Sequence, residues 1–146
     1  MVLDWIASSK RFVGFLSKPF PSTLILTNRS LNVVDFGNIL KDPTNSFDGQ
    51  DFTAPEDGYY YFETQVGFEK DQVDIPDLTG FVSLQNVNAA HYRLMINDRR
   101  VSVKVSGIAE LTTGDVVRVV VLADSNPIVS VMLQSGGMYF NGYKIN

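Results

Sequence analysis

Residues 52–62 read Phe-Thr-Ala-Pro-Glu-Asp-Gly-Tyr-Tyr-Tyr-Phe, and the predicted fold depends most on these residues. Pro55 has no backbone N–H to donate, so it interrupts the hydrogen bonding of a sheet. The Glu-Asp-Gly that follows has the composition of a tight turn. The aromatic run after Gly58 is typical of a β-strand, because aromatic side chains fit well on a pleated sheet. We therefore expect a turn followed by a strand.

The predicted strand has two apolar faces. Because successive side chains of a strand point to opposite sides, Tyr60 and Phe62 share one face while Tyr59 and Tyr61 share the other. A strand with one solvated face usually alternates apolar and polar residues instead. One face can belong to the core of the domain, and the other then needs a second layer or another subunit.

Four motifs resemble those of the complement C1q globular head and the tumour necrosis factor-like superfamily. The family pattern F-[ST]-A-P-x-x-G-x-Y-x-F matches residues 52–62. Residues 36–48 resemble its F-x-x-V-L…Y-D lead-in, residues 111–117 its L-x-x-G-D-x-V turn, and residues 140–143 its closing F-x-G-[FY]. The resemblance covers roughly residues 36–146. The motif positions expected to build the core are Phe52, Pro55, Gly58, Tyr60, Phe62, Gly114, Phe140 and Gly142.

The resemblance implies a jelly roll of two packed sheets and three such subunits around a threefold axis. In that arrangement Tyr60 and Phe62 would face the core, and Tyr59, Tyr61 and Tyr139 would face neighbouring subunits. Tyrosine suits an interface because its ring buries area while its hydroxyl can stay hydrogen-bonded. The alternative is that all these tyrosines serve the core of a monomer.

Strand and turn signals along the chain also predict an all-β protein. About ten short antiparallel strands with turns every 8–12 residues are typical of a jelly-roll β-sandwich. Tyr92–Ile96 and Val101–Val105 are expected to pair as a hairpin through Asn97-Asp98. Residues 135–137 are expected to form a turn before a last strand. We expect an N-terminal arm and first strands in residues 1–35 and the jelly roll in residues 36–146, together forming one domain.

Composition excludes several functional classes. The 146 residues carry a net charge of -4, which argues against nucleic-acid binding. The absence of cysteine excludes disulfide and thiolate chemistry. We expect neither a transmembrane segment nor a signal peptide, since Asp4 interrupts the first apolar residues and the basic pair at 10–11 follows them.

No catalytic constellation is evident, so the sequence predicts a protein that is not an enzyme. His91 is the only histidine, and neither a nucleophile elbow nor a phosphate loop is present. Asp71, Asp74 and Asp77 recur every third residue, and such oxygen ligands suit calcium. Because they lack a recognised calcium-loop spacing, we expect no metal or cofactor, with calcium in this loop as the alternative.

Function is therefore expected to depend on the surface of the protein. Loop residues Asp71, Asp74 and Asp77, together with Arg99 and Arg100, are candidate ligand contacts. We expect a homotrimeric binding module for a protein or glycan receptor, on a virion or another extracellular surface, as in a viral or phage attachment or spike protein. The alternatives are a structural jelly-roll subunit of a virion, such as a capsid or decoration protein, and a secreted ligand of the complement or cytokine type.

Overall fold

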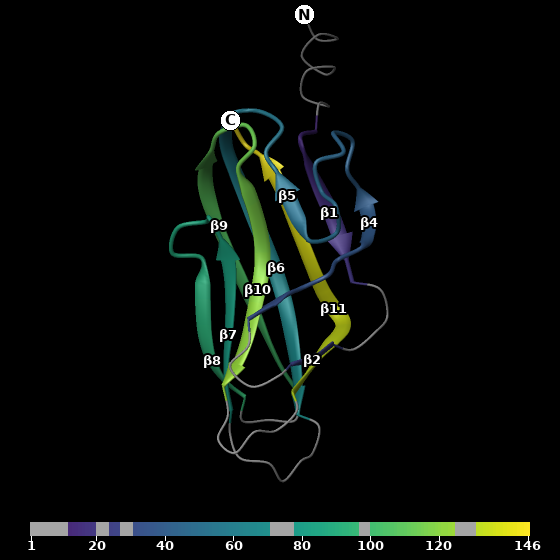
Figure 1. The fold of residues 1–146 in the computed structure, drawn as a ribbon, viewed down its shortest axis with the longest axis vertical. Coiled ribbons are helices and arrows are strands. Elements are labelled where there is room, and N and C mark those ends of the chain that lie inside the picture. The colour runs from purple at the N-terminus through teal and green to yellow at the C-terminus, as the bar shows by residue number, and fades with distance from the viewer. Residues whose placement is uncertain (1–11, 20–23, 27–30, 71–77, 97–99, 125–130) are drawn as a thin grey trace, which may run out of the picture.

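The computed structural model describes residues 12–19, 24–26, 31–70, 78–96, 100–124 and 131–146, and these form antiparallel strands joined by turns and loops (Figure 1). The strands are β1 (Gly14–Lys18), β2 (Leu24–Leu26), β3 (Asn32–Val33), β4 (Asn38–Lys41), β5 (Asp51–Thr53), β6 (Gly58–Lys70), β7 (Leu78–Gln85), β8 (His91–Ile96), β9 (Arg100–Leu111), β10 (Val116–Asp124) and β11 (Val131–Lys144).

Two sheets make up the described part of the molecule. Sheet A has the order β4-β1-β11-β6-β9, with β2 also paired to β11. Sheet B has the order β3-β10-β7-β8, with β5 also paired to β10. The long strands β6, β9, β10 and β11 run along the length of the sandwich (Figure 1). This architecture confirms the predicted all-β jelly-roll sandwich.

The core between the sheets is rich in aromatic rings. Phe15 of β1 stacks on Phe47 with ring centroids 4.3 Å apart and meets Phe140 of β11 edge-on at 4.8 Å. Phe52 of β5 lies 5.4 Å from Phe62 of β6 and so joins the two sheets. Burying each such side chain contributes about 1.5–3 kcal/mol relative to leaving it exposed. The aromatic residues of the motif thus lie at the centre of the fold.

Glycines of the motifs lie where a side chain would not fit or would be strained. A Cβ on Gly142 would lie 2.5 Å from the ring of Phe62 and 2.9 Å from that of Phe15. Gly114 has a φ of +95°, a left-handed conformation that L side chains rarely adopt. Pro55, by contrast, is exposed beside the turn rather than buried in the core.

The hairpin expected between residues 92–96 and 101–105 is wrong. β8 pairs with β7 in sheet B, whereas β9 pairs with β6 in sheet A. The turn residues Asn97 and Asp98 lie outside the described residues. Two apolar strands that are close in sequence matched the local pattern of a hairpin. In the structure each strand instead makes its backbone hydrogen bonds with a different sheet. The connection between β8 and β9 therefore crosses from one sheet to the other.

The turn expected at residues 135–137 is also wrong. The chain stays extended from Val131 to Lys144 as the single strand β11. From Gln134 to Tyr139 on β11, the partner on β6 advances only from Gly67 to Gln65, which marks a bulge. A bulge accommodates extra residues in one strand without ending it. The Ser-Gly-Gly sequence is therefore used to bend a strand instead of to reverse the chain.

Candidate functional site

The outer face of sheet A carries side chains of β6 that point away from the core. Tyr60 and Phe62 are fully buried on the inner face, and Tyr59 and Tyr61 therefore point outward. Tyr59 is 44% exposed and Tyr61 is half-buried. The alternation expected from the sequence thus places the two pairs of aromatic residues on opposite sides of the sheet.

Neighbouring strands extend this aromatic surface. Tyr61 lies opposite Ile108 of β9 and Tyr143 of β11, and residues opposite each other in a sheet share a face. The rings of Tyr61 and Tyr143 are 5.5 Å apart, and Ile108 is 56% exposed. Here the name "outer strip" denotes five apolar side chains of this face, on β6, β9 and β11, that are wholly or partly accessible: Tyr59, Tyr61, Ile108, Tyr139 and Tyr143.

A carboxylate holds two of the tyrosines in place. The hydroxyl of Tyr139 donates to Oε1 of Glu63 at 2.6 Å, and the hydroxyl of Tyr61 donates to Oε2 at 3.0 Å. Lys104 of β9 places its Nζ 3.4 Å from Oε1. Three adjacent strands therefore contribute to one polar cluster beside the outer strip.

The cluster shifts the pKa of its members. Burial, and then the nearby Glu63 carboxylate, raise the pKa of Tyr139 to about 12. Burial and the same carboxylate raise the pKa of Tyr61 as well. The hydrogen bond from Tyr139 is the main cause of a lowered pKa at Glu63. Near neutral pH the cluster therefore contains an ionised carboxylate and two neutral phenols.

The predicted ligand-contact residues are only partly described. Asp71, Asp74, Asp77 and Arg99 lie outside the described residues. Arg100 begins β9, and its exposed guanidinium lies with Nε 3.7 Å from Oε1 of the buried Glu69. This contact links β9 to β6 at the end of the sandwich away from the C-terminus.

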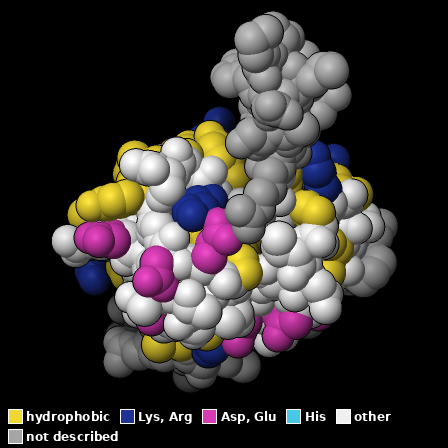
Figure 2. Space-filling view, turned by 90° about the horizontal axis from the view of Figure 1, so that it is seen from above, with side chains coloured by type: hydrophobic (Ala, Val, Ile, Leu, Met, Phe, Trp, Pro, Cys, Tyr) yellow, Lys and Arg dark blue, Asp and Glu magenta, His cyan; other side chains and the backbone are white. Residues whose placement is uncertain are grey.

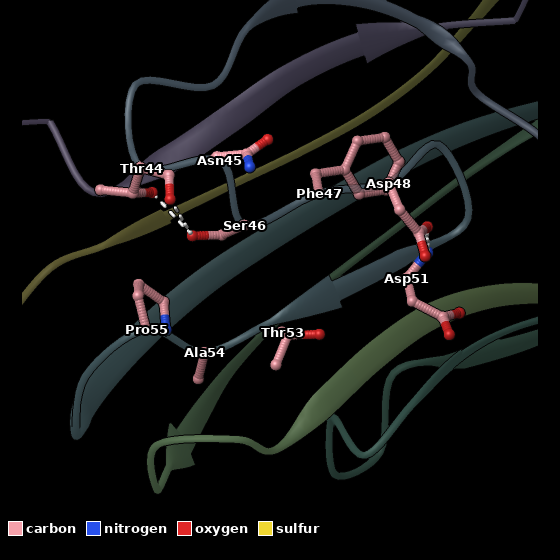
Figure 3. Close-up of a pocket in the computed structure, with 9 residues that line it drawn as sticks. All are labelled: Thr44, Asn45, Ser46, Phe47, Asp48, Asp51, Thr53, Ala54 and Pro55. Atoms are coloured by element: carbon pink, nitrogen blue, oxygen red, sulfur yellow. Dashed lines mark hydrogen bonds between the residues drawn. The ribbon is translucent and has the colours of Figure 1, made fainter.

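A pocket of about 410 Å³ lies beside β5 (Figure 3). It is lined by Thr44, Asn45, Ser46, Phe47, Asp48, Asp51, Thr53, Ala54 and Pro55. Its two carboxylates already have partners within the protein. Oδ1 of Asp48 accepts the backbone N–H groups of Gln50 and Asp51, and Oδ2 of Asp51 lies 2.9 Å from Arg118. These contacts stabilise the loop beside β5.

The end of the sandwich that carries the C-terminus is stabilised by contacts between turns. Asp57 accepts hydrogen bonds from the backbone N–H and the hydroxyl of Thr113, at 2.8 and 2.9 Å, and these bonds lower its pKa. Lys144 donates to Glu56 at 2.9 Å. Figure 2 views this end and shows acidic and basic side chains interspersed with polar and hydrophobic ones. The side chains of Asp57 and Lys144 thus link segments that meet at this end of the sandwich.

Within the described ranges, no group of three or more histidine, cysteine or carboxylate side chains is placed to hold a metal ion. His91 is exposed at the start of β8, with its ring 6.0 Å from that of Phe81. Among the same residues, none forms a helix of the length and hydrophobicity needed to cross a bilayer.

Several residues of this site were not predicted from the sequence. Glu63 lies two residues after Tyr61 on β6, so the alternation of side chains along a strand could have placed it on the outer face. Ile108 and Tyr143 required the pairing of β6 with β9 and β11, which no local pattern reveals.

Comparison with known proteins identifies solved structures with a similar fold. No family model and no curated protein matches the sequence. The globular domain of zebrafish complement 1qA protein aligns over 92% of this chain and 98% of its own, with a TM-score of 0.51 and 21% sequence identity. Murine APRIL, in a crystal structure at pH 8.5, aligns over 92% of this chain and 100% of its own, with a TM-score of 0.60 and 15% identity. The chain therefore has the jelly-roll fold shared by the globular head of complement C1q and tumour necrosis factor-like proteins.

Proposed function

We propose that the chain is a homotrimeric, non-enzymatic binding module whose subunits associate through the outer face of sheet A. The observation that carries this proposal is the outer strip. One face of an antiparallel sheet is normally polar when it meets water, yet here Tyr59, Ile108 and Tyr143 are each at least 40% exposed on one side. Large exposed apolar patches mark interaction surfaces.

The fold supports the trimeric state in this proposal. Proteins that resemble the C1q head and tumour necrosis factor are typically trimeric binding modules, and they are generally not enzymes. A closed ring brings two different patches of one subunit type together. The exposed Tyr92 on β8, the edge strand of sheet B, offers an apolar contact for such a second surface. Three copies can thus cover three outer strips.

Receptor recognition would then fall to loops that the assembly leaves free. Three weak sites on one rigid trimer give avidity far above that of a single site. The fold alone does not name the ligand, so we propose a protein or glycan receptor. An attachment or spike protein of a virus or phage is the specific form of this proposal, with an extracellular or virion-surface location. Binding to cells or to a glycan panel supports it, whereas assembly onto particles without such binding supports a structural role.

Light scattering behind a sizing column tests the assembly directly. The wild type is expected to have a mass near three times 16.2 kDa. Tyr61→Asp places a charge within the interface and is expected to return the mass to one chain, because an unpaired buried charge strongly disfavours association. Leu31→Asp is the matched control, since it adds the same charge to a 63% exposed side chain next to β3 of sheet B. A monomeric wild type would overturn the proposal.

A further inference from the structure

Glu63 accepts hydrogen bonds from two tyrosine hydroxyls of the outer strip that association would remove from water. Covering a tyrosine ring also removes water from its hydroxyl, and a hydroxyl buried without a partner weakens association by about tenfold or more. In the single chain the hydroxyls of Tyr61 and Tyr139 both already donate to Glu63. Their hydrogen bonds are therefore in place before any other molecule arrives.

The geometry uses both oxygens of one carboxylate. Tyr139 donates to Oε1 and Tyr61 donates to Oε2, so each hydroxyl has an acceptor of its own. Bonds to an ionised acceptor are stronger than bonds between neutral groups. Because the two tyrosines lie on β11 and β6, the carboxylate also fixes their rings across two strands.

We propose that Glu63 is a positioning residue of the association surface, which orients and satisfies the hydroxyls of Tyr61 and Tyr139 so that a second copy of this chain can cover the outer strip. This inference rests on the proposed function, because the occupant of the surface is another subunit. It assigns a role to a charged residue at the margin of an apolar surface, where a charge would otherwise oppose burial.

The same geometry makes assembly depend on the ionised form of Glu63. The charged and titratable groups that face it are Lys104 from β9, Tyr139 from β11 and Tyr61 from β6 itself. Its register neighbours Ser106 and Asn141 carry no charge. A protonated carboxyl would lose its attraction to Lys104, would carry a proton on one of its two accepting oxygens, and would be a weaker acceptor because it is no longer ionised. Association is thus retained near neutral pH and weakens on acidification below the ordinary carboxyl range.

A cycle of variants tests the role of Glu63. Glu63→Leu should weaken association by about tenfold or more, because the hydroxyl of Tyr139 loses its acceptor and the hydroxyl of Tyr61 keeps only that of Ser106 as a partner. In a Tyr61→Phe/Tyr139→Phe background the hydroxyls are absent, and there Glu63→Leu should leave association unchanged or strengthen it. Glu63→Gln tests the charge alone, and Asp35→Asn is the matched control, because Asp35 is an exposed carboxylate in the connection between β3 and β4. Dissociation constants are measured by sedimentation over a dilution series, with circular dichroism to verify folding.

The outcomes separate this inference from the proposed function. If the wild type assembles and Tyr61→Asp does not, but Glu63→Leu weakens association equally with and without the two hydroxyls, the positioning role is overturned and the trimer stands. An acid profile of association that is identical in wild type and Glu63→Gln overturns the dependence on ionised Glu63. A wild type that stays monomeric at every concentration overturns both. If Glu63→Leu fails to fold, comparing the pH dependence of association in the wild type and in Glu63→Gln still tests the role of Glu63.

Discussion

Replacing Gly142 with alanine tests whether the closing motif is required by packing. A Cβ at this position would lie 2.5 Å from Cδ1 and 2.6 Å from Cε1 of Phe62, and 2.9 Å from Cε1 of Phe15. Real Cβ atoms essentially never approach other atoms this closely, so the rings must move. Both phenylalanines are fully buried, and Phe15 is held between Phe47 and Phe140. The added methyl group therefore has no open space to occupy.

The expected cost is that of overpacking a core. Overpacking destabilises by about 1–3 kcal/mol, and we expect about 2 kcal/mol for Gly142→Ala. For a chain of this length that lowers the melting temperature by about 4–8 °C. Thermal unfolding followed by circular dichroism measures the shift. Because association also stabilises the folded state, wild type and variant are compared at one protein concentration.

A second substitution identifies the ring responsible. Phe62→Leu is destabilising by itself, but it removes the ring atoms nearest to the added methyl group. The double variant should therefore be more stable than the sum of the single effects predicts, by about 1 kcal/mol. Effects that add to within about 0.3–0.5 kcal/mol would refute the steric argument. So would a Gly142→Ala variant with the melting temperature of the wild type.

Two further predictions concern hydrogen-bonded side chains, and a third concerns titration. Tyr60→Phe removes a 2.7 Å bond to the carbonyl of Glu56 and should cost about 1 kcal/mol, seen as a lower melting temperature; an unchanged value would contradict it. The pKa of Asp57 in the folded protein is lowered from its ordinary value of 3.8. The ionised carboxylate therefore stabilises the fold above pH 3.8, and this stabilisation is lost as the pH falls through the pKa of the folded protein. An NMR titration of the Asp57 carboxyl should find its midpoint below 3.8. The pKa of Tyr139 is raised to about 12, so its neutral form stabilises the fold below pH 10 and this contribution is lost as pH rises from 10 to 12. Tyrosinate absorbance should show a late-titrating group that Tyr139→Phe removes, and uniform titration of all six tyrosines near pH 10 would contradict this.

Much of the fold was predictable because it depends on local chemistry. The alternation of β6 assigned its side chains to opposite faces, and period-2 patterning is a property of the strand itself. Gly114, in its left-handed turn, likewise lies in a motif recognisable from the sequence. The all-β class and the jelly-roll resemblance followed from such signals. The site was predicted less completely, since only Tyr59, Tyr61 and Tyr139 of the outer strip were named beforehand.

Local sequence thus specifies which segments are extended and which of their side chains share a face, whereas the partner of each strand depends on the whole sandwich. β8 and β9 are neighbours in the chain but belong to different sheets, and β11 continues through a Ser-Gly-Gly bulge. Tyr61, Glu63 and Tyr139 meet although Tyr139 is 76 residues from Glu63. Strand pairing is selected by the burial of whole faces across the sandwich, and residues close in sequence carry too little of that free energy to select a partner.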